Sequence, residues 1–77
     1  MIEISGKVVG VINEEHRTFF LVKNELGGFE KSCDVYRHYQ SVEEGVSGTF
    51  RVEGWEFWNV NTVNWEAVLR IVKFEED

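Results

Sequence analysis

The chain has 77 residues and a net charge of −6 at pH 7, which fits one domain (residues 1–77) with a single small core. Fourteen acidic residues against eight Lys and Arg exclude a general binder of duplex nucleic acid, because that affinity comes mostly from basic residues that neutralise phosphates. With one cysteine and two histidines, no internal disulfide can form, and we expect no metal and no cofactor. No apolar run approaches the ~20 residues of a membrane span, so we expect a cytoplasmic protein without a membrane segment.

Short β-branched and aromatic runs separated by Gly and Asn predict strands along the whole chain. No segment combines a helical period with caps. Strands are expected at residues 2–12, 18–23, 34–42, 48–53 and 66–74, with a loop at 24–31 and a turn at 43–45. Five strands in so short a chain predict an all-β fold, a small closed or nearly closed barrel. Its core is expected to include Val8, Leu21, Val35, Phe50, Val52, Val68 and Leu69.

The run from Asp34 to Val42 predicts an aromatic surface. On a strand, Tyr36, His38 and Gln40 would lie on one face. Flat polar rings on one face of a sheet are typical of proteins that stack unpaired bases. Ordinary sheet packing is the alternative interpretation of so short a segment.

Ordered blocks along the chain resemble a cold-shock domain, the small OB-fold family that binds single-stranded RNA and DNA. Gly6-Lys7-Val8 is similar to the family's opening strand, Phe20-Leu21 to part of its first ribonucleoprotein motif, and residues 34–39 to its second. Residues 44–54 and 66–68 resemble the fourth strand and the start of the fifth, so the likeness covers most of the chain. The resemblance implies an OB-type antiparallel barrel whose second and third strands present rings to unpaired bases.

We therefore expect binding of single-stranded RNA or DNA, without enzymatic activity. The expected stacking rings are Phe20, Tyr36 and His38, the candidate phosphate contacts are Lys7, Arg17 and Lys23, and Gln40 is a candidate reader of base edges. Each of these cations also fits a solvated charge at a strand end. Cys33 and His38 would lie on different faces about 16 Å apart along a strand, so this pair does not indicate a thiol enzyme.

Three tryptophans, Trp55, Trp58 and Trp65, lie close together among asparagines. One interpretation is a hairpin whose rings cover one end of the barrel, and the other is an exposed recognition surface. The second supports an alternative function, in which Trp55, Phe57 and Trp58 of an acidic interaction module, a small inhibitor or adaptor, bind a basic protein partner. We expect Trp65 to be buried and at least one of Trp55 and Trp58 to be accessible. The sequence leaves the oligomeric state open.

Overall fold

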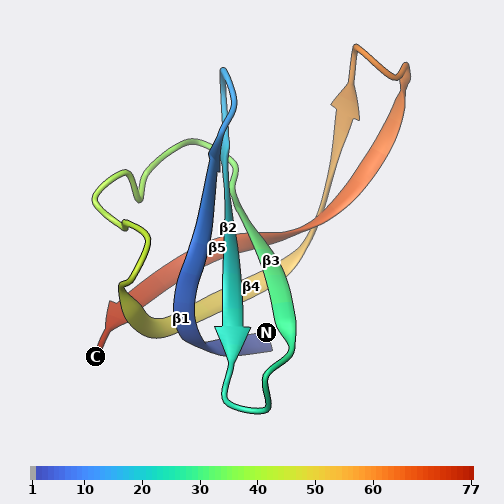
Figure 1. Cartoon of the computed structure of the whole chain (residues 1–77). Helices are drawn as coiled ribbons and strands as arrows, with labels where there is room; N and C mark the ends of the chain where they lie inside the picture. The colour runs from blue at the N-terminus through green and yellow to red at the C-terminus, as the bar shows by residue number, and fades with distance from the viewer. Residues whose placement is uncertain (1) are drawn as a thin grey trace.

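A computed structural model describes residues 2–77, in which there are five strands and no helix (Figure 1). The strands are β1 (Ile2–Asn13), β2 (Thr18–Asn24), β3 (Phe29–Asp34), β4 (Ser47–Asn59) and β5 (Asn64–Glu76). They close into a barrel in the order β1-β2-β3-β5-β4. This confirms the all-β, five-stranded OB-type barrel. The barrel is mixed rather than wholly antiparallel, because β3 and β5 run parallel. Within residues 2–77, no helix is long and apolar enough to cross a membrane.

Strand β1 belongs to both sides of the barrel. Its first half pairs with β4 and its second half with β2. A bulge between Val8 and Gly10 bends the strand between these two partners. At Gly6 the backbones approach so closely that a Cβ atom would lie 2.1 Å from the carbonyl oxygen of Lys23. Glycines therefore allow the tight curvature that closes so small a barrel.

The barrel interior is filled by aromatic and β-branched side chains. Phe50 is fully buried, and its ring centroid lies 5.8 Å from that of Phe20 and 4.5 Å from that of Phe74. Of the expected core residues, Val8, Phe50 and Val52 are fully buried, whereas Leu21, Val35, Val68 and Leu69 are half-buried. The buried cluster consists of Ile4, Val8, Phe20, Val22, Val42, Phe50, Val52 and Ile71.

Residues 35–46 form a loop, so the prediction of a strand within 34–42 is wrong. The buried carboxylate of Asp34 accepts hydrogen bonds from the backbone N–H groups of His38 (2.9 Å) and Tyr39 (2.7 Å). Arg37 has a left-handed φ of 56°, which an extended strand does not contain. Val42 is buried against the core, so the loop packs against the barrel.

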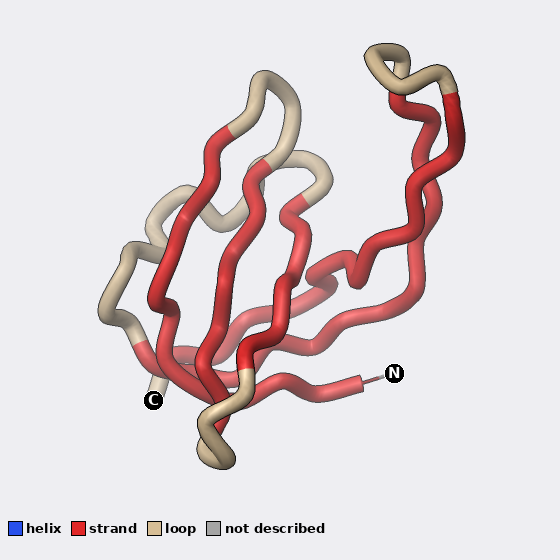
Figure 2. The backbone as a smooth tube through the Cα atoms, turned by 45° about the vertical axis from the view of Figure 1, so that its right-hand side comes forward, coloured by secondary structure: helices blue, strands red, loops and turns tan. Residues whose placement is uncertain are grey.

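Beyond the barrel, β4 and β5 continue as a two-stranded hairpin, residues 54–69, which we call the arm. Figure 2 shows the arm projecting from the barrel, and the molecule measures 37 Å along its longest axis against 22 and 20 Å across. The hairpin confirms one sequence interpretation, but its rings do not cover the barrel end. The side chain of Trp65 is 65% exposed and that of Trp58 is 48% exposed. Burial of Trp65 was therefore a wrong prediction, and accessibility of Trp58 is confirmed.

Candidate functional site

The outward surface of β1, β2 and β3 forms one continuous face. On β2, Phe20 and Val22 point into the barrel, so the alternate residues between and beside them point out. The strand registers align these outward residues in three rows: Ile12 with Phe19 and Cys33, Gly10 with Leu21 and Lys31, and Lys7 with Lys23 and Phe29. We call this surface the β1–β2–β3 face.

The β1–β2–β3 face is basic in an acidic protein. The three rows contain three lysines and no Asp or Glu, although the whole chain has 14 acidic residues; Glu3 of β1 also points outward, but it lies beyond these rows and pairs with Arg51 of β4. Lys7 lies directly opposite Lys23, and like charges in that position destabilise a sheet. A bound anion would relieve this repulsion.

One aromatic ring on this face is freely accessible. Phe29 is 62% exposed, and the Nζ of Lys23 lies 6.0 Å from its ring centroid. Phe19, by contrast, is only 8% exposed, with the Nζ of Lys31 at 4.7 Å from its ring centroid. The face therefore offers the open ring of Phe29 beside Lys23, which in turn lies opposite Lys7. Single-strand binding proteins combine such rings and cations to hold bases and phosphates.

A groove of about 990 Å³ lies where the arm leaves the barrel. It joins the β1–β2–β3 face through Phe19 and Lys31. On the barrel side it is lined by Phe19, Lys31 and Cys33, and on the arm side by Gly54, Trp55, Glu56, Glu66, Ala67, Val68 and Leu69. The groove combines an apolar lining with both signs of charge.

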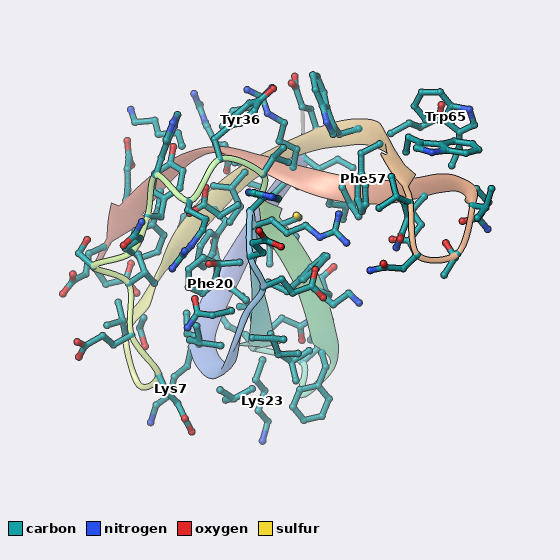
Figure 3. The ribbon with its side chains drawn as sticks, turned by 90° about the horizontal axis from the view of Figure 1, so that it is seen from above. Lys7, Phe20, Lys23, Tyr36, Phe57 and Trp65 are labelled. Carbon is teal, nitrogen blue, oxygen red and sulfur yellow. The ribbon has the colours of Figure 1, made fainter. Side chains whose placement is uncertain are left out.

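Arg17 connects the arm to the barrel. Its guanidinium carbon lies 3.9 Å from the ring centroid of Phe57 and 5.5 Å from that of Phe19, and it pairs with Glu14. Figure 3 shows Phe57 between the barrel and the part of the arm that carries Trp65. Because Arg17 is already engaged by two rings and a carboxylate, it is better placed to hold the arm than to bind phosphate.

Cys33 lies buried in the lining of the groove. Desolvation raises the pKa of its thiol to about 11, with a smaller lowering contribution from Arg17. At neutral pH the group is therefore a thiol, and the thiolate is the nucleophilic form. Among residues 2–77 no three His, Cys, Asp or Glu residues are grouped as metal ligands. The absence of enzymatic activity stays a prediction.

The structure divides the expected site residues into separate groups: it pairs Lys7 with Lys23, and elsewhere it places Tyr36 beside His38. Lys7 and Lys23 share the β1–β2–β3 face, at the same edge of Figure 3, whereas Tyr36 lies on the opposite side of the barrel (Figure 3). Tyr36 is 60% exposed and its ring centroid lies 5.9 Å from that of His38. The two rings are thus neighbours, but a turn rather than a strand places them. Gln40 donates through Nε2 to the backbone carbonyl of Arg37 within the same loop.

Phe20 is not a surface ring. It has no exposed area and contacts Phe50 inside the barrel, so its interpretation as a stacking residue is wrong. Residues 18–23 are apolar on both faces of β2, and alternation in the sequence therefore does not tell which phenylalanine points out. The register with β1 and β3 decides it, because adjacent residues on a strand face opposite sides.

Phe29 and Lys31 are functional candidates that the sequence interpretation placed in a loop. The side-chain oxygen of Asn24 accepts hydrogen bonds from the backbone N–H groups of Leu26 and Gly28, and Gly27 has a φ of 86°. These contacts complete a tight turn, so β3 begins at Phe29. In the sequence, Asn24 followed by Gly27 and Gly28 is the pattern that indicates a short hairpin turn here.

The residues of the alternative partner site have mixed accessibility. The guanidinium of Arg70 lies 4.6 Å from the Trp55 ring centroid, and Phe57 is covered by Arg17. Trp58 alternates to the other side of the arm, where it makes an edge-to-face contact with Trp65 at 5.6 Å between ring centroids. Of the three residues, Trp58 is the one most open to a partner.

No protein-family model matches the chain, and no significant match exists among curated proteins or solved structures. The likeness to cold-shock domains therefore rests on the sequence blocks. The structure independently establishes the five-stranded barrel and the order of its strands.

Proposed function

We propose that the β1–β2–β3 face binds single-stranded RNA or DNA, as a divergent cold-shock-like domain. The observation that supports this most is the set of three lysines without a carboxylate on that face, beside the exposed ring of Phe29. Lys7, Lys23 and Lys31 contact phosphates, and a base stacks on Phe29. The protein acts by binding rather than catalysis, and its reduced, buried cysteine fits the cytoplasm.

The proposed site is short and its affinity depends mainly on stacking. When three lysines neutralise three phosphates, the nucleic acid releases few counterions. We therefore expect a shallow dependence on salt, with a slope of about −2 in log K against log salt. A face of three strands fits the lower end of OB-fold sites, roughly four nucleotides. Duplex nucleic acid hides its base faces, so a single strand is the better ligand.

An alternative function, binding of a basic protein partner through Trp55, Phe57 and Trp58, has one observation in its favour. Trp58 is exposed on an arm whose residues 54–69 include Glu56 and Glu66 but no Lys or Arg. A cation and an apolar side chain of a partner would complement that surface. If this were the function, the protein would not bind a single strand, and a titration with labelled DNA and RNA would show no binding.

The Lys23→Gln variant tests the proposal in a fluorescence-anisotropy titration with a labelled mixed-sequence 12-nucleotide DNA and RNA. We expect weaker binding at every sequence and a salt slope that is smaller by about 0.7, because one phosphate contact is lost. Lys73→Gln is the matched control, since Lys73 is exposed on β5 and pairs with Glu75 away from this face. Equal effects of the two variants, or no binding by the wild type at low salt, would overturn the proposal.

A further inference from the structure

The arm presents a strand edge that lacks a partner. In the described chain, β5 and β3 share the register pair Cys33 with Arg70, and β5 residues 64–69 pair with β4 on their other side. An isolated two-stranded ribbon is at best marginally stable in water. Proteins usually protect such edges with charged side chains, above all Lys, with Pro or with a bulge, and residues 64–69 contain one charged residue, Glu66, with no Lys, Pro or bulge. The edge is therefore suited to receive a further strand.

The arm also exposes large apolar side chains. Val60 and Val63 at its tip are 73% and 69% exposed, beside the edge-to-face pair of Trp58 and Trp65. Soluble monomers rarely expose large apolar patches without a binding role, and these four exposed side chains all belong to one hairpin. Figure 2 shows that this hairpin projects from the barrel. It carries both the exposed apolar residues and the open edge, so one partner can cover both.

We propose that a second copy of the chain supplies the missing strand. The β5 edges of two copies pair antiparallel about a two-fold axis at Ala67, which creates a four-stranded sheet from the two arms. In this register Trp65 lies opposite Leu69 of the second copy, Glu66 lies opposite Val68, and the two Ala67 residues face each other. Opposed residues include an apolar pair and no pair of like charges, and the small Ala side chain fits at the axis.

Neighbouring registers are less favourable. An axis at Glu66 would place the two Glu66 carboxylates directly opposite, which destabilises a sheet. An axis at Val68 would place Glu66 of one copy opposite Arg70 of the other. The backbone of Arg70 already pairs with Cys33 of β3, and its guanidinium pairs with Glu53 at 2.6 Å. The arm sequence therefore selects the register at Ala67, and this self-complementarity favours a second copy over an unrelated strand.

The expected dimer is weak and its salt dependence is distinctive. Five paired residues per strand with the adjoining indoles bury roughly 1,000 Å² in total, the lower limit of a specific interface, so we expect dissociation constants of roughly 10–500 μM. Each copy carries a charge of −6, and salt screens the repulsion between copies. Salt should thus strengthen the dimer, whereas it weakens nucleic-acid binding. The inference does not depend on the proposed function.

Sedimentation equilibrium at 10–500 μM, in 0.05 and 0.5 M NaCl, combined with amide hydrogen exchange, tests this inference. We expect a monomer–dimer equilibrium that tightens with salt, and exchange protection at residues 64–69 that grows with protein concentration. Ala67→Lys places two cations at the axis and should weaken association at least tenfold. Asn61→Lys makes the same change of charge at the exposed turn of the arm and should leave it unchanged; thermal melts establish that both variants fold.

Three results would overturn the inference. One is a monomer at 500 μM in both salt concentrations. A second is association without added protection at residues 64–69, which would mean that the copies meet through another surface. The third is equal association of the Ala67→Lys and Asn61→Lys variants, since a charge at the proposed axis must matter more than one at the tip.

Discussion

Phe50→Ala is expected to lower the free energy of unfolding by about 3–5 kcal/mol. Phe50 is fully buried, and its ring packs between Phe20 and Phe74 across the barrel. Removing it leaves a cavity at the centre of the core, which the closed strands cannot fill by collapse. A chain of 77 residues has roughly 4–12 kcal/mol of stability in total, so urea or thermal unfolding should find this variant unfolded or nearly so.

The matched control for Phe50→Ala is Phe29→Ala. Phe29 is the same residue type but is 62% exposed, and its truncation should cost less than about 1 kcal/mol. Similar unfolding midpoints for the two variants would show that the described core does not stabilise the protein.

Gly6→Ala is expected to destabilise the protein by about 2–4 kcal/mol. A Cβ atom at Gly6 would lie 2.1 Å from the carbonyl oxygen of Lys23 and 2.8 Å from its carbonyl carbon. These are backbone atoms, so no side-chain rotation can relieve the clash, and β1 must separate from β2. Urea unfolding monitored by circular dichroism measures the loss.

Gly54→Ala is the matched control for Gly6→Ala. A Cβ atom at Gly54 would meet nothing within 4 Å, and glycine within a strand costs roughly 0.5–1 kcal/mol relative to alanine. We expect this variant to be equally or more stable than the wild type. If Gly6→Ala were tolerated as well as Gly54→Ala, the close approach of β1 and β2 would be wrong.

The barrel could be predicted where alternation is clear. Residues 48–53 place Phe50 and Val52 inward with Arg51 outward, and the structure has this arrangement. The strand does not end at Gly54 as expected, because Gly54 pairs with Leu69 of β5. A hairpin in the tryptophan-rich segment was one interpretation of the sequence, but its continuity with the barrel strands was not expected. The extension of β4 and β5 into an arm is a long-range pairing.

The segment 34–42 shows why alternation alone can mislead. Its aromatic residues recur with the period of a strand, but the Asp34 carboxylate binds the backbone N–H groups of His38 and Tyr39. Such side-chain to backbone bonds offer the chain an alternative to a sheet ladder. A turn-forming Asp at the end of β3 therefore outweighs the aromatic pattern that follows it.

The residue types of the candidate site were predictable, and their grouping was not. Lys7 and Lys23 were recognised as cations near strand ends, but their direct opposition arises from the pairing of β1 with β2. Phe29 was missed because β3 begins earlier than expected, and Phe20 was misplaced because β2 is apolar on both faces. Each error concerns register, which depends on contacts between distant segments.

Binding of a labelled mixed-sequence single strand by Phe29→Ala and Tyr36→Ala is the decisive measurement for the β1–β2–β3 face, because the two rings are about equally exposed but only Phe29 lies on that face, beside Lys23. We expect Phe29→Ala to weaken binding by about 1–3 kcal/mol through lost stacking, and Tyr36→Ala to bind like the wild type. Loss of binding in Tyr36→Ala with none in Phe29→Ala would place the site on the loop, and no binding by the wild type would remove the site altogether. Either result would contradict single-strand binding on the β1–β2–β3 face.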